Sequence, residues 1–287
     1  MEFLFLILIP VLTTGQNLMI KKYDQHTETQ KRAYIEYLLF LSIGSLIFLL
    51  IQSGVKIGWN GPTVGYSVLF GGVFIFTIVC NVLAVNNGPL SLTSLVVSYS
   101  LIVSTLYGIL FLKEPASPFL WIGIVLLILS LALIHLREKE MKRRFSWKWA
   151  ALAVSAAVGN AVLICIQKHY QLRYAGFFQT EFMFYAMLFV GTVSAILLLV
   201  TRTKMEKTAL KSGGLFAFPA GMMNAAVNLL VMSVSVSLPL SLVSPIISAG
   251  GIIMTAAAAL LLYRETLSRR EIVGLVIGVV SIIFLSI

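Results

Sequence analysis

Charged residues are scarce in this chain. They make up 11% of its 287 residues, whereas soluble domains carry about 25%. Hydrophobic residues supply 59%, and the mean hydropathy is +0.97. A water-soluble fold of this length has too little interior to bury so much apolar surface. The composition therefore excludes a soluble globular domain and predicts an all-α integral membrane protein.

Cysteine and histidine are scarce as well, with 2 and 3 residues respectively. Cys80 and Cys165 both lie within apolar runs, which argues against a disulfide framework. The histidines (His26, His135 and His169) show no metal-ligand spacing, and the sequence contains no H-E-x-x-H motif, nucleophile elbow or P-loop. We therefore expect no metal, no cofactor and no enzymatic activity, and we expect any transport to be independent of ATP.

Long apolar runs are what the chain has instead. A membrane-spanning helix needs about 20 consecutive, mostly apolar residues. Ten such segments fit along the chain and leave only short connections, with no room for a soluble domain. They lie at about 2–20, 34–51, 65–86, 89–112, 118–136, 148–168, 178–200, 213–237, 239–262 and 269–286.

Acidic residues are the scarcer charged class, with 11 Asp and Glu against 21 Lys and Arg and a net charge of +10. In a soluble chain this excess would indicate a nucleic-acid partner, but in a membrane protein it marks cytoplasmic loops. Most of the basic residues follow the first, third, fifth, seventh and ninth segments. The positive-inside rule then predicts a multi-pass protein of the cell membrane with both termini outside, and no nucleic-acid partner.

The chain contains an internal repeat. The tetrapeptide Pro-Leu-Ser-Leu occurs at residues 89–92 and again at 239–242. Other residues match in step beyond it, among them Gly123 with Gly274 and Ser130 with Ser281. This duplication predicts two five-helix repeats, residues 1–140 and 145–287. Because five is an odd number, the second repeat must enter the membrane in the opposite orientation, as an inverted-topology repeat.

The fourth segment ends with Lys113-Glu114, and the ninth ends with the matching pair Arg264-Glu265. Two sets of five spans, with a proline before the fourth and ninth and a basic-Glu pair after each, resemble the EamA family of the drug/metabolite transporter superfamily. The resemblance implies a basket of helices around a central cavity that carries a small metabolite by alternating access. Glu114 and Glu265 themselves are expected to cap the ends of the fourth and ninth spans.

Three features depart from the family pattern. The best-known members keep their termini in the cytoplasm, whereas the charge distribution here predicts both termini outside. Small relatives carry a glutamate in the first span for proton or cation coupling, whereas this span offers the polar residues Thr13, Thr14, Gln16 and Asn17. Family members often have a proline partway along the fourth and ninth spans, whereas here the fourth has none and the ninth has Pro245 near its start. Coupling to a proton or an ion, and the bend of these two spans, therefore stay open.

Polar side chains inside an apolar span need a partner or a cavity. Asn224 and Asn228 are four residues apart, so they share one face of the eighth span near mid-membrane, where repeat transporters bind substrate. We expect both amides to line the pathway. The alternative is that they join neighbouring helices by hydrogen bonds.

The other candidate substrate-binding residues are distributed over six spans. Glu181 lies about a turn into the seventh span, deeper than any other acidic residue, and is either a proton-coupling group or partner of an amine, or a hydrated residue of the outer rim. The remaining candidates are polar or aromatic, and they are Gln16 and Asn17 in the first span, Asn81 in the third, Tyr99 in the fourth, Asn160 in the sixth, Tyr185 in the seventh and Ser248 in the ninth.

A polar but nearly uncharged lining predicts a secondary transporter for a small polar or zwitterionic metabolite, of the amino acid or amine class. Its partners would be that small molecule and the lipid bilayer, with the oligomeric state open. One alternative is a flippase for a lipid-linked head group. The other is a non-transporting subunit of a membrane assembly.

Overall fold

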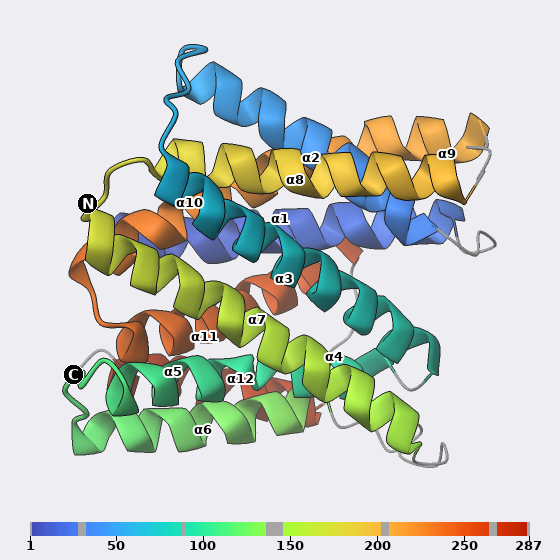
Figure 1. Ribbon diagram of the computed structural model, residues 1–287. Coiled ribbons are helices and arrows are strands. Elements are labelled where there is room, and N and C mark those ends of the chain that lie inside the picture. The colour runs from blue at the N-terminus through green and yellow to red at the C-terminus, as the bar shows by residue number, and fades with distance from the viewer. Residues whose placement is uncertain are drawn as a thin grey trace. The chain divides into compact units, whose positions relative to one another are not determined.

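The computed structural model describes residues 2–27, 33–87, 90–135, 146–201, 207–263 and 269–285, and the regular structure within these ranges is entirely helical. Apolar segments form helices because hydrocarbon offers the backbone N–H and C=O groups no other partner. The helices, drawn in Figure 1, are α1 (Glu2–Thr27), α2 (Ala33–Gln52), α3 (Gly61–Asn87), α4 (Leu90–Ser98), α5 (Ser100–Leu110), α6 (Pro118–His135), α7 (Trp147–Tyr174), α8 (Gln179–Val200), α9 (Lys207–Ser212), η1 (Gly213–Ala217), α10 (Phe218–Ser237), α11 (Leu240–Tyr263) and α12 (Arg269–Leu285).

Among the described residues, 6 helices are long and apolar enough to cross a membrane. Shorter apolar helices lie at Leu95–Leu110, Pro118–Ile134, Leu240–Gly251 and Ile272–Leu285. Together these helices coincide with the ten expected spans. The prediction of an all-helical, multi-pass membrane protein is confirmed.

The fourth span is not one continuous helix. Tyr99 separates α4 from α5, and its N–H donates to the carbonyl oxygens of both Leu95 and Val96, at 3.2 and 3.1 Å. The N–H of Ile102 then donates back to the Tyr99 carbonyl at 3.0 Å, across three residues instead of four. Such tightening of the helical ladder can interrupt a helix without a proline. By contrast, Pro245 lies inside α11, which continues to Tyr263.

The chain folds into two compact units. Unit 1 comprises Met1–Val11, Phe76–Lys168 and Ser237–Ile287, and unit 2 comprises Leu12–Ile75 and His169–Val236. Each unit therefore takes residues from both halves of the sequence.

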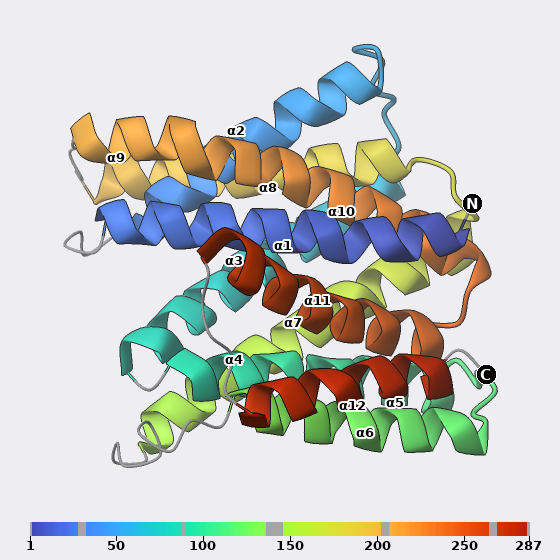
Figure 2. The same ribbon diagram turned by 180° about the vertical axis from the view of Figure 1, so that it is seen from behind.

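In unit 1, α6 and α12 lie side by side in both views (Figures 1 and 2). Their contact depends on small residues, because apolar side chains gain no hydrophobic stabilisation from leaving lipid for each other. A Cβ on Gly123 of α6 would meet Leu285, and a Cβ on Gly274 of α12 would meet Ile134, each at 2.7 Å. The Ser130 hydroxyl adds a hydrogen bond of 2.6 Å to the Gly274 carbonyl.

In unit 2, α2 and α10 approach each other even more closely. A Cβ on Gly44 would fall against the carbonyl oxygen of Phe218, and a Cβ on Gly221 would fall against that of Leu41. The hydroxyl of Ser45 donates to the Gly221 carbonyl at 2.7 Å. The two backbones can therefore touch only because both contact positions are glycine.

Contacts at the helix ends show which connections share a side of unit 1. At one end Glu114, which follows α5, contacts the start of α11 and Lys168 of α7. At the other end the indole N–H of Trp149, in the first turn of α7, donates to the hydroxyl of Thr93 in α4 at 2.9 Å. The starts of α4 and α7 thus lie together, away from the end of α5 and the start of α11.

In unit 2 as well, the start of one helix lies beside the end of another. The hydroxyl of Thr180, at the start of α8, donates to Gln52, at the end of α2, at 3.0 Å. The His26 ring, at the end of α1, lies 5.2 Å from the Phe216 ring just before α10. Successive spans that run in alternate directions give this arrangement of ends.

Replacing Gly221 with alanine should destabilise the protein. The added Cβ meets a backbone carbonyl, which cannot rotate away as a flexible side chain can, and overpacking of this kind costs about 1–3 kcal/mol. The midpoint of thermal unfolding in detergent measures the effect. The control is Gly72→Ala in α3, where a Cβ meets nothing within 4 Å. Equal midpoints for the two variants would contradict the close contact.

Candidate functional site

The structure joins three of the predicted residues in unit 2. The Asn228 side-chain N–H₂ donates to the Asn224 carbonyl at 2.8 Å and lies 3.2 Å from the Asn224 side-chain oxygen. Gln16 of α1 approaches the same oxygen with its own N–H₂ at 3.5 Å. Asn224 is 5% exposed, while Gln16 and Asn228 are half-buried. We call Gln16, Asn224 and Asn228 the amide cluster.

One backbone carbonyl fixes the orientation of the whole amide cluster. The Asn224 carbonyl can only accept, so the Asn228 atom beside it must be the nitrogen. The Asn224 atom that faces this nitrogen must then be its oxygen, and Gln16 must also present a nitrogen. The Asn224 nitrogen is left facing the sulfur of Met187 at 4.0 Å, a weak acceptor. Among the described residues, the Asn224 side-chain nitrogen therefore has only this weak acceptor.

Glu181 and Tyr185 lie at the end of unit 2, where they hold the connection between α2 and α3. A Glu181 carboxylate oxygen accepts from the Gly58 N–H at 3.4 Å, and the Tyr185 hydroxyl donates to the Gly58 carbonyl at 3.2 Å. The Trp59 ring packs edge-on against the Tyr185 ring at 5.7 Å. These contacts favour the rim interpretation of Glu181.

The other predicted residues do not join a common cluster through the described contacts. Asn17 is exposed, and Asn81 and Asn160 are half-buried. The Ser248 hydroxyl donates to the Ser244 carbonyl of its own helix at 3.0 Å. Tyr99 marks the break between α4 and α5.

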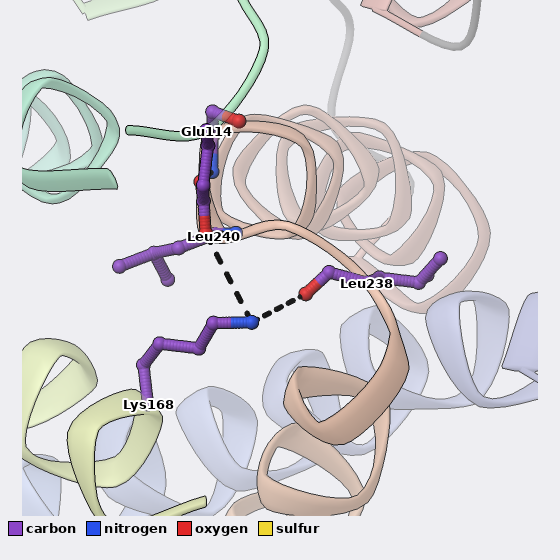
Figure 3. A network of polar contacts seen from close by, with 5 residues as sticks. Glu114, Lys168, Leu238 and Leu240 are labelled. Atoms are coloured by element: carbon purple, nitrogen blue, oxygen red, sulfur yellow. Dashed lines mark hydrogen bonds and ion pairs between the residues drawn. The ribbon is translucent and has the colours of Figure 1, made fainter. Parts of the chain in front are cut away.

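Sequence reasoning missed a buried charge cluster in unit 1, shown in Figure 3. The two carboxylate oxygens of Glu114 accept the N–H groups of Leu240 and Ser241, each at 2.8 Å. The Lys168 ammonium lies 3.9 Å from Glu114 and donates to the Leu238 carbonyl at 2.8 Å. The side chains of Lys168 and Glu114 are only 6% and 9% exposed. We call this group the Glu114 cap.

The turn after α5 aims Glu114 at α11. Lys113 adopts a left-handed conformation with φ of 55°, as is common just after a helix C-terminus. The Glu114 N–H reaches back six residues to the Gly108 carbonyl at 3.1 Å. A Cβ at Gly108 would overlap the Glu114 carboxylate. The expectation that Glu114 caps its own span is therefore corrected: it caps the start of the ninth span. Glu265 lies outside the described residues.

A second buried carboxylate was also missed. Glu36, in the first turn of α2, is 2% exposed, whereas Glu181 is half-buried. Its neighbour Tyr37 contacts the Tyr23 ring of α1, with the centroids 5.4 Å apart. Glu36 lies two residues after the start of an expected span, and this position in the sequence did not predict that its side chain is buried. Within the described part of the chain, no three His, Cys, Asp or Glu residues form a group that could hold a metal ion.

The apolar helices with paired polar groups inside them define a multi-pass helical membrane protein. Residues 2–136 match the model of the EamA-like transporter family. Over these residues the chain is similar to the EamA family of the drug/metabolite transporter superfamily, which confirms the resemblance.

The fold also resembles solved structures, of which 29 chains match. One of them, described as "Crystal structure of protein", has a TM-score of 0.73 and 12% sequence identity, and the match covers 99% of this chain and 97% of that chain. At this identity the likeness shows the fold alone. No curated protein matches the sequence.

Replacing Asn224 with leucine should lower the thermal unfolding midpoint. The change removes an acceptor that Gln16 and Asn228 share, and a buried donor left without its partner costs about 1–3 kcal/mol. The same substitution at Asn81, for which no hydrogen bond occurs among the described residues, should leave the midpoint unchanged or raise it. The amide cluster has no structural role if the two variants unfold alike.

Proposed function

We propose that this protein is a secondary transporter that carries a small polar or zwitterionic metabolite, of the amino acid or amine class, by alternating access. The observation that carries the proposal is the amide cluster. It gathers three uncharged polar side chains from α1 and α10 within a transporter-family protein that has few charged residues. Amides offer both donors and acceptors, so they suit a solute that carries both.

The proposal includes ten spans arranged as two inverted repeats, residues 1–140 and 145–287, with both termini outside. The contacts between α6 and α12 support it. Gly274 follows Gly123 by 151 residues, the interval by which Leu285 follows Ile134, and Gly123 faces Leu285 as Gly274 faces Ile134. A twofold relation between the repeats would produce such reciprocal contacts.

In this proposal the amide cluster belongs to the substrate site, and Asn17, Asn81, Tyr99, Asn160 and Ser248 line the pathway. Glu181 and Tyr185 lie at its rim. Any coupling to a proton or an ion would need an ionisable group, and the buried carboxylate of Glu36 is a better candidate for it than Glu181.

A thermal-shift screen of the purified protein tests the function. The panel holds amino acids, amines, sugars, nucleotides and lipid head groups. A ligand at 100 times its dissociation constant adds about 2.7 kcal/mol of stability when it binds only the folded state. We expect an amino acid or amine to raise the midpoint, and this shift should disappear in Asn224→Ala. Asn87→Ala, an exposed asparagine of α3, should keep the shift.

Each alternative gives a different result in the same screen. If only a lipid-linked compound raised the unfolding midpoint and no soluble solute did, the protein would be a flippase. A non-transporting assembly subunit should respond to no solute, and its Asn224→Ala variant should differ only in stability. Uptake of the hit into proteoliposomes then separates transport from binding.

A further inference from the structure

The Glu114 cap lies within unit 1, to which all of its residues belong. Unit 1 includes residues up to Lys168 in α7, and the chain returns to unit 1 at Ser237. The Lys168 ammonium donates to the Leu238 carbonyl at 2.8 Å. The last residue of one segment of unit 1 is therefore bonded to the second residue of the next segment. Glu114 joins the same group from the turn after α5.

We infer that the Glu114 cap is a latch that holds α5, α7 and α11 together in one conformational state of the transport cycle and opens in another. Glu114 neutralises the free N–H groups at the start of α11 and lies beside the Lys168 charge. The inference rests on the proposed alternating-access function, for which it supplies a point of control.

The geometry favours a switch with two discrete states. Both carboxylate oxygens are taken by backbone N–H groups of α11, and Lys168 is held by a backbone carbonyl. Displacing one charge would leave the other nearly buried without its counter-charge, so the contacts are lost or kept together. The three segments are far apart in sequence, so no local chain connection holds them when the latch opens.

Gly108 is part of the latch, although its backbone carbonyl only receives the Glu114 N–H. A Cβ at this position would occupy the place of the Glu114 carboxylate and would also lie 3.2 Å from the Ser241 nitrogen. The closed state therefore requires a glycine in the last turns of α5, where alanine would otherwise favour the helix.

The chain has two native cysteines that can report on the latch. Cys165 lies three residues before Lys168, on the same face of α7, and is half-buried. Cys80 is buried in α3. Opening of the latch should expose Cys165 alone, whereas unfolding should expose both thiols.

The test is the rate at which a membrane-impermeant methanethiosulfonate reagent labels each cysteine of the protein in lipid nanodiscs, followed by mass spectrometry. Glu114→Gln and Lys168→Met should label Cys165 at least tenfold faster than the unmodified protein, with no change at Cys80. Lys168→Arg keeps the charge and should label at nearly the original rate.

Gly108→Ala provides a second route that leaves both charges in place. It should accelerate labelling of Cys165, whereas Gly251→Ala, where an added Cβ meets nothing within 4 Å, should not. The latch is wrong if Cys165 labels at the original rate in Glu114→Gln, Lys168→Met and Gly108→Ala, or if Cys80 accelerates with Cys165. No solute is present in this assay, so its failure would leave the proposed transport function standing.

Discussion

The first N–H groups of a helix have no partner within that helix, and in hydrocarbon they cannot turn to water. In this protein a carboxylate from another part of the chain supplies the partner for α11. Glu114 lies 126 residues before Leu240 in the sequence, and the glycine at position 108 leaves room for its side chain. The start of α11 is therefore fixed to the end of α5 and, through Lys168, to α7.

Elsewhere the helices are joined by contacts that need little side-chain volume. Lipid tails are as apolar as leucine, so burying apolar surface against another helix contributes little to association. Close backbone approach and interhelical hydrogen bonds take over this role. Gly44 and Gly221 let α2 meet α10, and Gly123 and Gly274 let α6 meet α12. These contacts explain why the chain can hold together with so few charged residues.

The positions of the spans could be predicted from the sequence because hydropathy over about 20 residues reports directly on transfer into lipid. The break at Tyr99 could not be predicted, since it arises from a tightened hydrogen-bond pattern and has no proline to mark it. For the same reason, nothing in the local sequence marks Tyr99 as the position of the break.

In the candidate site, too, contacts within one helix could be predicted from the sequence, whereas contacts between helices could not. The four-residue interval between Asn224 and Asn228 predicted correctly that these residues share a face, and their hydrogen bond follows from helical geometry. The contact of Asn224 with Gln16 depends on the packing of α1 against α10, which no spacing encodes. The partners of Glu114 were hidden for the same reason, because a capping carboxylate is recognised by the helix that it caps.

In the proposed function, the distribution of charge bears on which solute the amide cluster can accept. Glu36, Glu114, Lys168 and Glu181 lie near helix ends, whereas the amide cluster is uncharged. A solute with net charge would lose its hydration there and find no counter-charge among the three amides. A neutral polar solute or a zwitterion brings no net charge and can exchange its hydrogen bonds with water for hydrogen bonds with amides. Under the proposed function, this asymmetry is the physical reason for preferring such solutes over inorganic ions as the cargo.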